Sequence, residues 1–292
     1  MPYLEQKYRS MPQESIQLCQ TGAELNRTCR YRSGNLIQLP RTGRVIVAGD
    51  LHGHIRNFER IVKMADLDNN ADTHVVLQEI IHGGPEDDYG GCLSYRLLLK
   101  AIRYKISYPD QVHILLGNHD TAVISNSSVL KSGREMNRAM KEAMQRHFAA
   151  NYSDVFKAMV EYLMSQPLAV RCENRIWISH SLPADREIDR FDLSIFNRPY
   201  TLDDIERFNP VYVLTWGRRH STAALERLAG MLDADVFILG HQPQEKGWTR
   251  VGSNTIILAS EHSYGCVLFF NLSQSYTADA LERNIVPLAE IE

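Results

Sequence analysis

The sequence predicts an α/β fold in which helices cover sheets, and two observations lead to this class. From Arg44 onward, short β-branched apolar runs alternate with longer segments in which apolar residues recur every three or four positions. Late in the chain the helical segments become scarce and strands follow one another. The alternation is typical of helix-covered sheets, and the late strands indicate a second sheet with hairpin connections.

Eight runs are expected to form buried strands, because each is short, nearly all apolar and followed by polar residues or glycine. They lie at residues 45–47, 75–77, 112–116, 168–170, 176–178, 236–239, 255–258 and 267–270. Helical spacing is clear between them; Ile55, Phe58 and Val62, for example, share one helical face. Helices are expected at residues 55–65, 95–106, 134–148, 154–164 and 223–232.

Length and composition favour a single domain. The chain has 292 residues, of which 44% are hydrophobic and 23% charged, so a substantial core can form. No internal repeat, low-complexity tract or linker divides it. We therefore expect a polar N-terminal extension at residues 1–43, with at most a short helix, followed by one domain at residues 44–292.

Charge, hydropathy and cysteine usage exclude several classes of protein. A net charge of −3 at pH 7 provides no basic field for nucleic acid. The chain lacks an apolar signal stretch and any run of the ~18 apolar residues that a membrane span needs. Its five cysteines, without a C-x-x-C pair, argue against a disulfide framework or a thiolate zinc site. We expect a cytoplasmic protein with reduced cysteines that binds neither nucleic acid nor membrane; the oligomeric state is left open.

Four of the predicted strands are followed directly by His, Asp or Asn. These segments are Gly-Asp-Leu-His-Gly-His from Gly49, Gly-Asn-His-Asp from Gly117, Ser-His from Ser179 and Gly-His-Gln-Pro from Gly240. Ligands bind at the carboxyl ends of strands in open α/β sheets, and glycine lets the backbone turn sharply there. One such segment alone is more often an ordinary turn, but four of them indicate a shared site.

The donor chemistry of these segments favours a metal site. They offer neutral imidazoles, carboxylates and one amide oxygen but no thiolate, a mixture that suits Mn, Fe or Zn. The donors are too many for one tetrahedral ion, so two ions that share a bridging carboxylate are the natural arrangement.

The order of the four segments resembles the calcineurin-like metallophosphoesterase superfamily, and within it the serine/threonine phosphoprotein phosphatase branch. Similar segments also occur at residues 215–219, 238–242 and 260–265, and the resemblance covers residues 44–271. It implies a four-layer α/β/β/α sandwich of two mixed sheets flanked by helices, with the catalytic domain at residues 44–292.

The resemblance also implies roles for the motif residues. The metal ligands would be Asp50 and His52 for one ion, and Asn118, His180 and His241 for the other. His119 would be the general acid that protonates the leaving oxygen. Asp120 stands where the family usually has Glu and is expected to orient this loop.

The second motif departs from the family pattern Leu-Gly-Asp-x-Val-Asp-Arg-Gly, because here it is Leu-Gln-Glu-Ile-Ile-His-Gly-Gly from Leu77. Glu79 replaces the bridging Asp, His82 the Asp that orients the catalytic histidine, and Gly83 a phosphate-binding Arg. In one interpretation Glu79 bridges the metals and His82 supports His119 or contacts the substrate. In the other, the bridging site is impaired and the protein is a weak enzyme or a binding protein.

Another cation must hold the phosphate if Gly83 replaces the usual arginine. Arg218 or Arg219 is expected to do so, since the guanidinium fork matches two phosphate oxygens. His262 and Tyr264 are further candidates for substrate contact.

The resemblance implies metal-dependent hydrolysis of phosphate monoesters, as a serine/threonine-type protein phosphatase, by direct attack of a metal-bridging hydroxide. Two divalent ions are the expected cofactor, with Mn²⁺ first and Fe or Zn as alternatives. The expected substrate is a phosphoprotein or a small phosphate ester. Two alternatives remain: a hydrolase of nucleotides or diadenosine polyphosphates, and a catalytically weakened, phosphatase-like binding protein.

Overall fold

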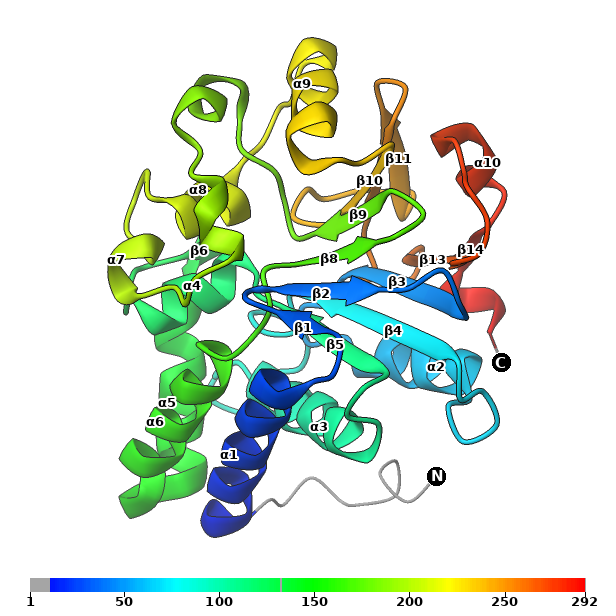
Figure 1. Cartoon of the computed structure of the whole chain (residues 1–292). Coiled ribbons are helices and arrows are strands. Elements are labelled where there is room, and N and C mark those ends of the chain that lie inside the picture. Colours follow the sequence, from blue (N-terminus) through cyan, green and yellow to red (C-terminus); the bar gives the residue numbers. More distant parts are fainter. Residues whose placement is uncertain (1–10, 132, 292) are drawn as a thin grey trace.

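The chain forms two mixed sheets packed face to face between two layers of helices (Figure 1). The computed structural model describes residues 11–131 and 133–291. All eight predicted strands and all five predicted helices are present in it. The predicted α/β/β/α sandwich is therefore confirmed.

The five-stranded sheet has the order β14-β13-β3-β4-β5. Its strands are β3 (Arg44–Asp50), β4 (Thr73–Gln78), β5 (Val112–Leu115), β13 (Cys266–Asn271) and β14 (Ile285–Pro287). β3, β4 and β5 are parallel, whereas β13 runs antiparallel to β3 and β14 antiparallel to β13. The carboxyl ends of the three parallel strands therefore meet at one edge.

The seven-stranded sheet has the order β1-β2-β8-β9-β10-β12-β11. Its strands are β1 (Arg32–Ser33), β2 (Leu36–Leu39), β8 (Ala169–Cys172), β9 (Ile176–Ser179), β10 (Val236–Leu239), β11 (Trp248–Val251) and β12 (Thr255–Leu258). β9, β10 and β12 are parallel neighbours, and β11 and β12 form one of the expected late hairpins. The late strands do not all join this second sheet, because β13 pairs with β3 of the other sheet.

Alternate side chains of the central strands face opposite layers. In β3, Val45 and Val47 pack in the apolar layer between the sheets, whereas Ile46 packs towards the helices. In β9, Ile178 faces the other sheet and Trp177 the second helical layer. Both faces of these strands are buried, which is why their sequences are nearly all apolar rather than alternating.

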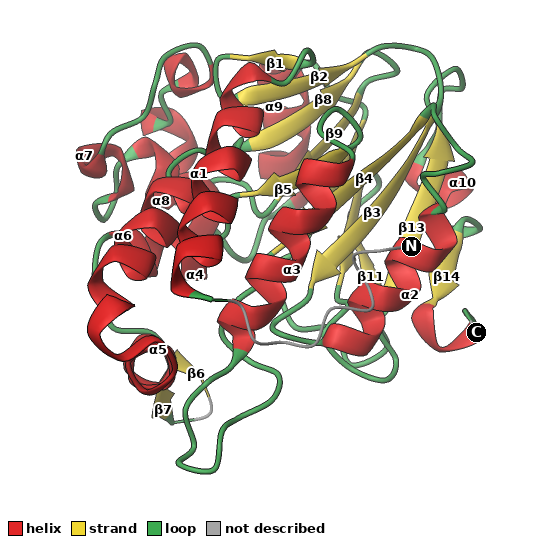
Figure 2. Ribbon diagram, turned by 90° about the horizontal axis from the view of Figure 1, so that it is seen from below, coloured by secondary structure: helices red, strands yellow, loops and turns green. Residues whose placement is uncertain are grey.

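Helices cover the outer face of each sheet. Against the five-stranded sheet lie α1 (Pro12–Thr28), α2 (Ile55–Ala65), α3 (Ser94–Ser107), α5 (Met136–Phe148) and α6 (Tyr152–Leu163) (Figure 2). Against the other lie α7 (Leu202–Ile205), α8 (Pro210–Trp216) and α9 (Thr222–Leu232). The remaining α-helices and strands of the described residues are two short helices, α4 (Asn118–Ile124) and α10 (Ala278–Glu282), and a hairpin of β6 (Leu130–Lys131) and β7 (Arg134–Glu135). Among the described helices, none is long and apolar enough to cross a bilayer.

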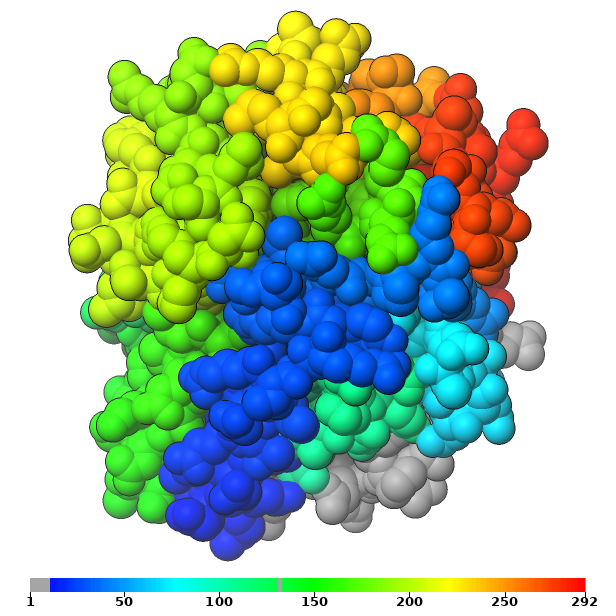
Figure 3. All heavy atoms as spheres, viewed as in Figure 1, coloured from blue at the N-terminus to red at the C-terminus, as the bar shows by residue number. Residues whose placement is uncertain are grey.

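The N-terminal segment is more ordered than predicted. The expectation of at most a short helix is wrong, because α1 has 17 residues and β2 pairs with β8. The side chain of Asn26 donates to Ser165 Oγ at 2.9 Å, and a Cβ added to Gly22 would lie 2.7 Å from Ile102. Figure 3 shows this segment, in blue, from the lower edge to the middle of one face. The sequence missed it because α1 packs through small residues rather than a large apolar stripe. Residues 1–10 lie outside the described residues, and the domain boundary at residue 44 stays a prediction.

A buried pair of histidines predicts a loss of stability in mild acid. His74 and His113 stack with ring centroids 5.4 Å apart, and burial lowers the pKa of His74 to about 4. The unfolded chain protonates His74 below its usual pKa of about 6.5, whereas the folded chain stays neutral until about pH 4. The free energy of unfolding should therefore fall by about 2 kcal/mol between pH 7 and pH 5 through His74 alone. Urea unfolding of chelator-treated protein measures this effect, and the free energy of unfolding should fall less between pH 7 and pH 5 in His74→Gln than in the wild type. Equal falls in the two proteins would mean that His74 is protonated in the folded chain.

Candidate metal centre

The predicted site residues lie where parallel strands end. Asp50 is the last residue of β3, Glu79 follows β4, and Asn118 begins α4 shortly after β5. In the other sheet, His180 and His241 follow the neighbouring parallel strands β9 and β10. All five side chains are at least nine-tenths buried. The structure thus brings together donors from five strand ends.

The two sheets are joined at this edge. Asp50 forms a parallel bridge with Ala259, and the amide of Ser260 donates to the carbonyl of Asp50 at 3.0 Å. The hydroxyl of Ser260 accepts a hydrogen bond from the amide of Gly49 at 3.0 Å. These bonds hold the loop after β12 against the end of β3.

One group of donors comes from Asn118, His180, His241 and Glu79. His180 Nε2 lies 2.8 Å from Asn118 Oδ1, 3.1 Å from Glu79 Oε2 and 3.2 Å from His241 Nδ1. His241 Nδ1 lies 2.9 Å from Asn118 Oδ1. Ligand atoms about 2.1 Å from one ion and at right angles to each other are roughly 3.0 Å apart. The spacing in this group therefore matches one ion.

Asp50 also belongs to this first group, since its ligand atom lies within 4.8 Å of those of Glu79 and His180. A second group consists of Asp50, His52 and Glu261. His52 Nε2 lies 3.3 Å from Glu261 Oε2 and 3.6 Å from Asp50 Oδ2. On its other side, Asp50 Oδ1 lies 3.6 Å from His180 Nδ1. Asp50 is thus the carboxylate common to both donor groups, and the bridging role of Glu79 stays a prediction.

The electrostatics of the centre fit a bound cation. Burial raises the pKa of Asp50 to about 7, with a further contribution from the charge of Glu79. Burial lowers the pKa of His180 and holds the pKa of His241 well below its usual range, so both rings are neutral and can donate a lone pair. Among the described residues, the buried atoms His180 Nδ1 and His241 Nε2 have no hydrogen-bond partner. A divalent cation would compensate the buried carboxylates.

Two of the motif glycines leave room for these carboxylates. A Cβ at Gly240 would lie 2.4 Å from Asp50 Oδ1, and a Cβ at Gly117 would lie 2.6 Å from Glu79 Oε2. Any larger residue at either position would displace a carboxylate from the centre. The glycines found at the strand ends therefore have a steric role in addition to turning the chain.

Several site residues adopt backbone conformations that non-glycine residues seldom take. The φ angles of His52, Glu79, His82 and His241 are 41°, 39°, 65° and 66°. Such left-handed conformations are unfavourable for L residues and tend to persist at functional sites, where the surroundings enforce them. The strain here supports a functional rather than a purely structural role for the loops.

The three predicted catalytic residues lie beside the first donor group. His119 Nδ1 is 2.7 Å from His82 Nδ1, and the amide of His119 donates to Glu79 Oε2 at 3.2 Å. Asp120 Oδ2 accepts from the amide of Gly117 at 3.0 Å, which fixes the turn before α4. Burial and the charge of Glu79 raise the pKa of Asp120 well above its usual value.

The predicted substrate contacts differ in position. Arg218 is exposed overall, but partial burial lowers its pKa, while the charges of Asp50 and Glu79 act to raise it. Arg219 is exposed as well, and it has a φ of 60°. His262 is held by backbone groups, with Nε2 2.8 Å from the carbonyl of Gln244, and Tyr264 is 70% exposed. The choice of Arg218 or Arg219 as the phosphate-binding residue stays a prediction.

A family model described as calcineurin-like phosphoesterase matches residues 43–245. The chain belongs to this family. Its members are phosphoric ester hydrolases that generally hold two metal ions. The two donor groups around Asp50 fit that cofactor.

Curated relatives of this phosphoesterase are distant. Human serine/threonine-protein phosphatase 5 is 22% identical over 186 residues, which are 59% of this chain and 33% of the relative. The symmetrical bis(5'-nucleosyl)-tetraphosphatase of Delftia acidovorans is 28% identical over 122 residues, or 41% of this chain and 36% of the relative. The matched part spans about a third of the length of each of these relatives.

Solved structures share the fold. A Saccharomyces cerevisiae protein serine/threonine phosphatase has a TM-score of 0.70 at 14% identity, covering 96% of this chain and 94% of that one. The cold-active protein-tyrosine phosphatase of a Shewanella species has a TM-score of 0.59 at 15% identity, covering 86% and 82%. At such low identity these matches support the sandwich architecture alone.

Sequence reasoning missed Glu261 as a site residue of this phosphoesterase. The loop 260–265 resembles a family segment, but its glutamate has no motif of its own. The only feature of the sequence that pointed to Glu261 was the position of its carboxylate in the loop after the strand predicted at residues 255–258. Its approach to His52 depends on how the two sheets meet, and this appears only in the folded chain.

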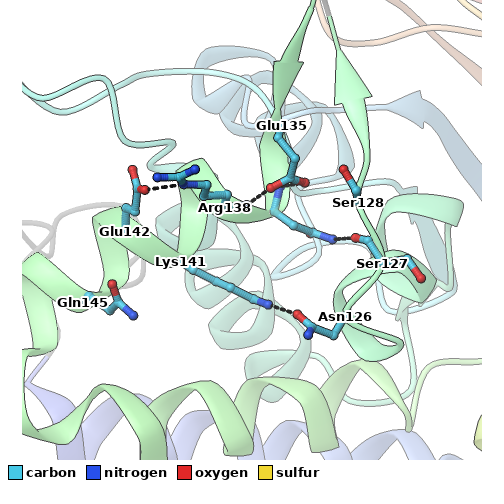
Figure 4. Close-up of a pocket in the computed structure, with 9 residues that line it drawn as sticks. Asn126, Ser127, Ser128, Glu135, Arg138, Lys141, Glu142 and Gln145 are labelled. Atoms are coloured by element: carbon cyan, nitrogen blue, oxygen red, sulfur yellow. Dashed lines mark hydrogen bonds and ion pairs between the residues drawn. The ribbon is translucent and has the colours of Figure 1, made fainter.

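A separate hollow of about 400 Å³ lies between the loop after α4 and helix α5 (Figure 4). Glu135 caps α5 by accepting hydrogen bonds from the amides of Asn137 and Arg138, and Arg138 also pairs with Glu142. None of the predicted site residues lines this hollow. Its charged side chains are paired locally, so it does not extend the metal centre.

Proposed function

We propose that this protein hydrolyses phosphate monoesters as a serine/threonine-type protein phosphatase, with Mn²⁺ as the preferred metal. The observation that carries this proposal is the convergence of Asn118, His180, His241 and Glu79 on one point, beside a second group that shares Asp50. Two divalent ions bound there would polarise the phosphoryl oxygens and lower the pKa of water.

Within the proposal, each residue has a specific task. Asp50 holds both halves of the centre together through its two oxygens, which approach His52 and His180. His119 donates its proton to the leaving oxygen, and His82 orients the His119 ring through their 2.7 Å contact. Arg218 binds phosphoryl oxygens in place of the arginine that Gly83 replaces.

The surroundings support a protein substrate. A groove of about 520 Å³ is lined by Thr121, Tyr212, Trp216 and neighbouring residues. The Trp216 ring lies 6.4 Å from the His241 ring, so the groove adjoins the donors. An extended phosphopeptide could lie along such a groove.

The five cysteines are all buried and free, which is compatible with the cytoplasmic location that the sequence predicts.

A second candidate is a hydrolase of diadenosine polyphosphates. The substitution of Gly83 for the usual arginine and the similarity to symmetrical bis(5'-nucleosyl)-tetraphosphatases support it. Such a substrate carries several phosphates and two bases, and it would use the same donors. A comparison of a phosphoserine peptide with diadenosine tetraphosphate, at equal concentration, separates the two candidates.

The proposal is tested by the metal dependence of p-nitrophenyl phosphate hydrolysis. Chelator-stripped protein is expected to be inactive, and Mn²⁺ should raise the rate by at least about 10³-fold, because the metals generate the nucleophile. Rates are compared with those after addition of Fe²⁺, Zn²⁺ or Co²⁺. Protein that binds two ions yet turns over neither this ester, the phosphopeptide nor the nucleotide would contradict the proposal and favour a binding protein.

A further inference from the structure

We propose that Glu261 is a third protein ligand of the metal ion held by Asp50 and His52. The loop 260–265, which resembles a family segment, would then supply a metal ligand that the resemblance does not assign. The inference rests on the proposed metal centre, but not on the identity of the substrate.

The hydrogen bonding of His52 defines the chemistry of this group. His52 Nδ1 lies 2.9 Å from the carbonyl oxygen of Ile81, which can only accept, so Nδ1 carries the proton. In the neutral ring, Nε2 then presents a lone pair. It faces Glu261 Oε2 at 3.3 Å and Asp50 Oδ2 at 3.6 Å, both of which are acceptors when ionised. Three converging lone pairs repel one another unless a proton or a metal cation lies between them, and the proposed centre supplies the metal cation.

The distances fit a tetrahedral ion. Ligand atoms about 2.1 Å from an ion at tetrahedral angles are roughly 3.4 Å apart, which lies between the two measured contacts of His52 Nε2. Two carboxylates and one neutral imidazole would also balance the charge of a divalent ion. Three protein ligands leave a fourth position open for water or substrate, as in catalytic sites.

The loop that carries Glu261 is fixed on both sides of this residue. The side-chain amide of Asn57, on α2, donates to the carbonyl of Ser260 at 2.7 Å and to that of His262 at 2.9 Å. The hydroxyl of Ser260 also donates to the carbonyl of Cys266 at 2.7 Å. Because the side chain of Glu261 is only 18% exposed, this clamp directs it towards His52 rather than into solvent.

The position of Glu79 explains why this half of the centre needs another carboxylate. Glu79 Oε2 lies 3.1 Å from His180 Nε2 and accepts from the amide of His119, so it belongs with the other donor group. Without Glu261, the ion beside His52 would have Asp50 and His52 as its protein ligands in this group. Glu261 supplies a second negative charge for this ion, and it does so from the loop after β12 of the seven-stranded sheet.

Glu261→Gln tests the inference, because it keeps the shape of the side chain and removes its charge. Chelator-stripped wild-type protein is titrated with Mn²⁺ in a calorimeter, and bound metal is counted by elemental analysis after gel filtration. We expect two ions in the wild type. In the variant we expect one ion at unchanged affinity, and a second whose affinity falls by at least about tenfold.

Two further variants complete the experiment. Glu245→Gln, which changes an exposed glutamate in a nearby loop, should bind both ions as the wild type does. Asn57→Ala should weaken the same ion as Glu261→Gln, since it releases the loop. Thermal unfolding of the metal-free proteins verifies that each one folds.

The outcomes separate this inference from the proposed centre. Two ions bound to Glu261→Gln with wild-type affinities would overturn the inference and leave the centre intact, with Glu261 as a hydrogen-bond acceptor of protonated His52. A wild-type protein that binds no Mn²⁺ would overturn both. Loss of both ions in Glu261→Gln would also contradict the inference about Glu261, because the ion bound by His180, His241 and Asn118 should remain in this variant.

Discussion

His119→Ala is expected to lower kcat for an alkyl phosphate ester by about 10²–10⁴-fold, while metal content stays at the wild-type value. The imidazole contacts His82 and its amide contacts Glu79, but it is not among the donors that converge around Asn118 or Asp50. The loss should be smaller for p-nitrophenyl phosphate, whose leaving group needs less help from a proton. Steady-state kinetics with both esters, together with elemental analysis, measure the effect.

The contrast with the neighbouring residue makes this prediction specific. Asn118→Ala removes an amide oxygen that lies within 2.9 Å of both His180 and His241, so it should reduce metal content as well as kcat. If His119→Ala lost metal to the same extent as Asn118→Ala, His119 would be a ligand rather than a general acid.

Asp50→Asn should have the largest effect, because Asp50 is common to both donor groups. Removing its charge lowers the affinity for both ions, and activity at limiting Mn²⁺ should fall by at least about 10³-fold. The fold should survive: burial raises the pKa of Asp50 to about 7, so the charge is unfavourable in the metal-free protein and a neutral amide relieves it.

The measurement for Asp50→Asn is activity against Mn²⁺ concentration, with metal counting and thermal unfolding in chelator. Asp154→Asn, at an exposed position of α6, is the matched control and should behave as wild type. Full activity and two bound ions in Asp50→Asn would show that Asp50 is not a metal ligand. A large drop in the unfolding temperature of the metal-free variant would instead assign Asp50 a structural role.

Much of the fold follows from local patterns in the sequence. The all-apolar runs at residues 45–47 and 176–178 form central strands, since strands buried on both faces need apolar side chains throughout. The helix predicted at residues 55–65 has those limits in the structure. By contrast, α1 was missed because its buried residues are small, such as Ser15, Cys19 and Gly22, and its place depends on α3 and α6.

The sequence by itself determined the chemistry of the centre: His, Asp and Asn after strands, glycines at the turns, and a glutamate where the family has aspartate. These properties are local, because strand ends and turn residues depend on near neighbours in the chain. Only the tertiary structure decided which donors meet. It joined Asp50 to both groups and brought Glu261 to His52. These contacts depend on how two sheets pack against each other, and the order of residues along one strand does not encode that packing.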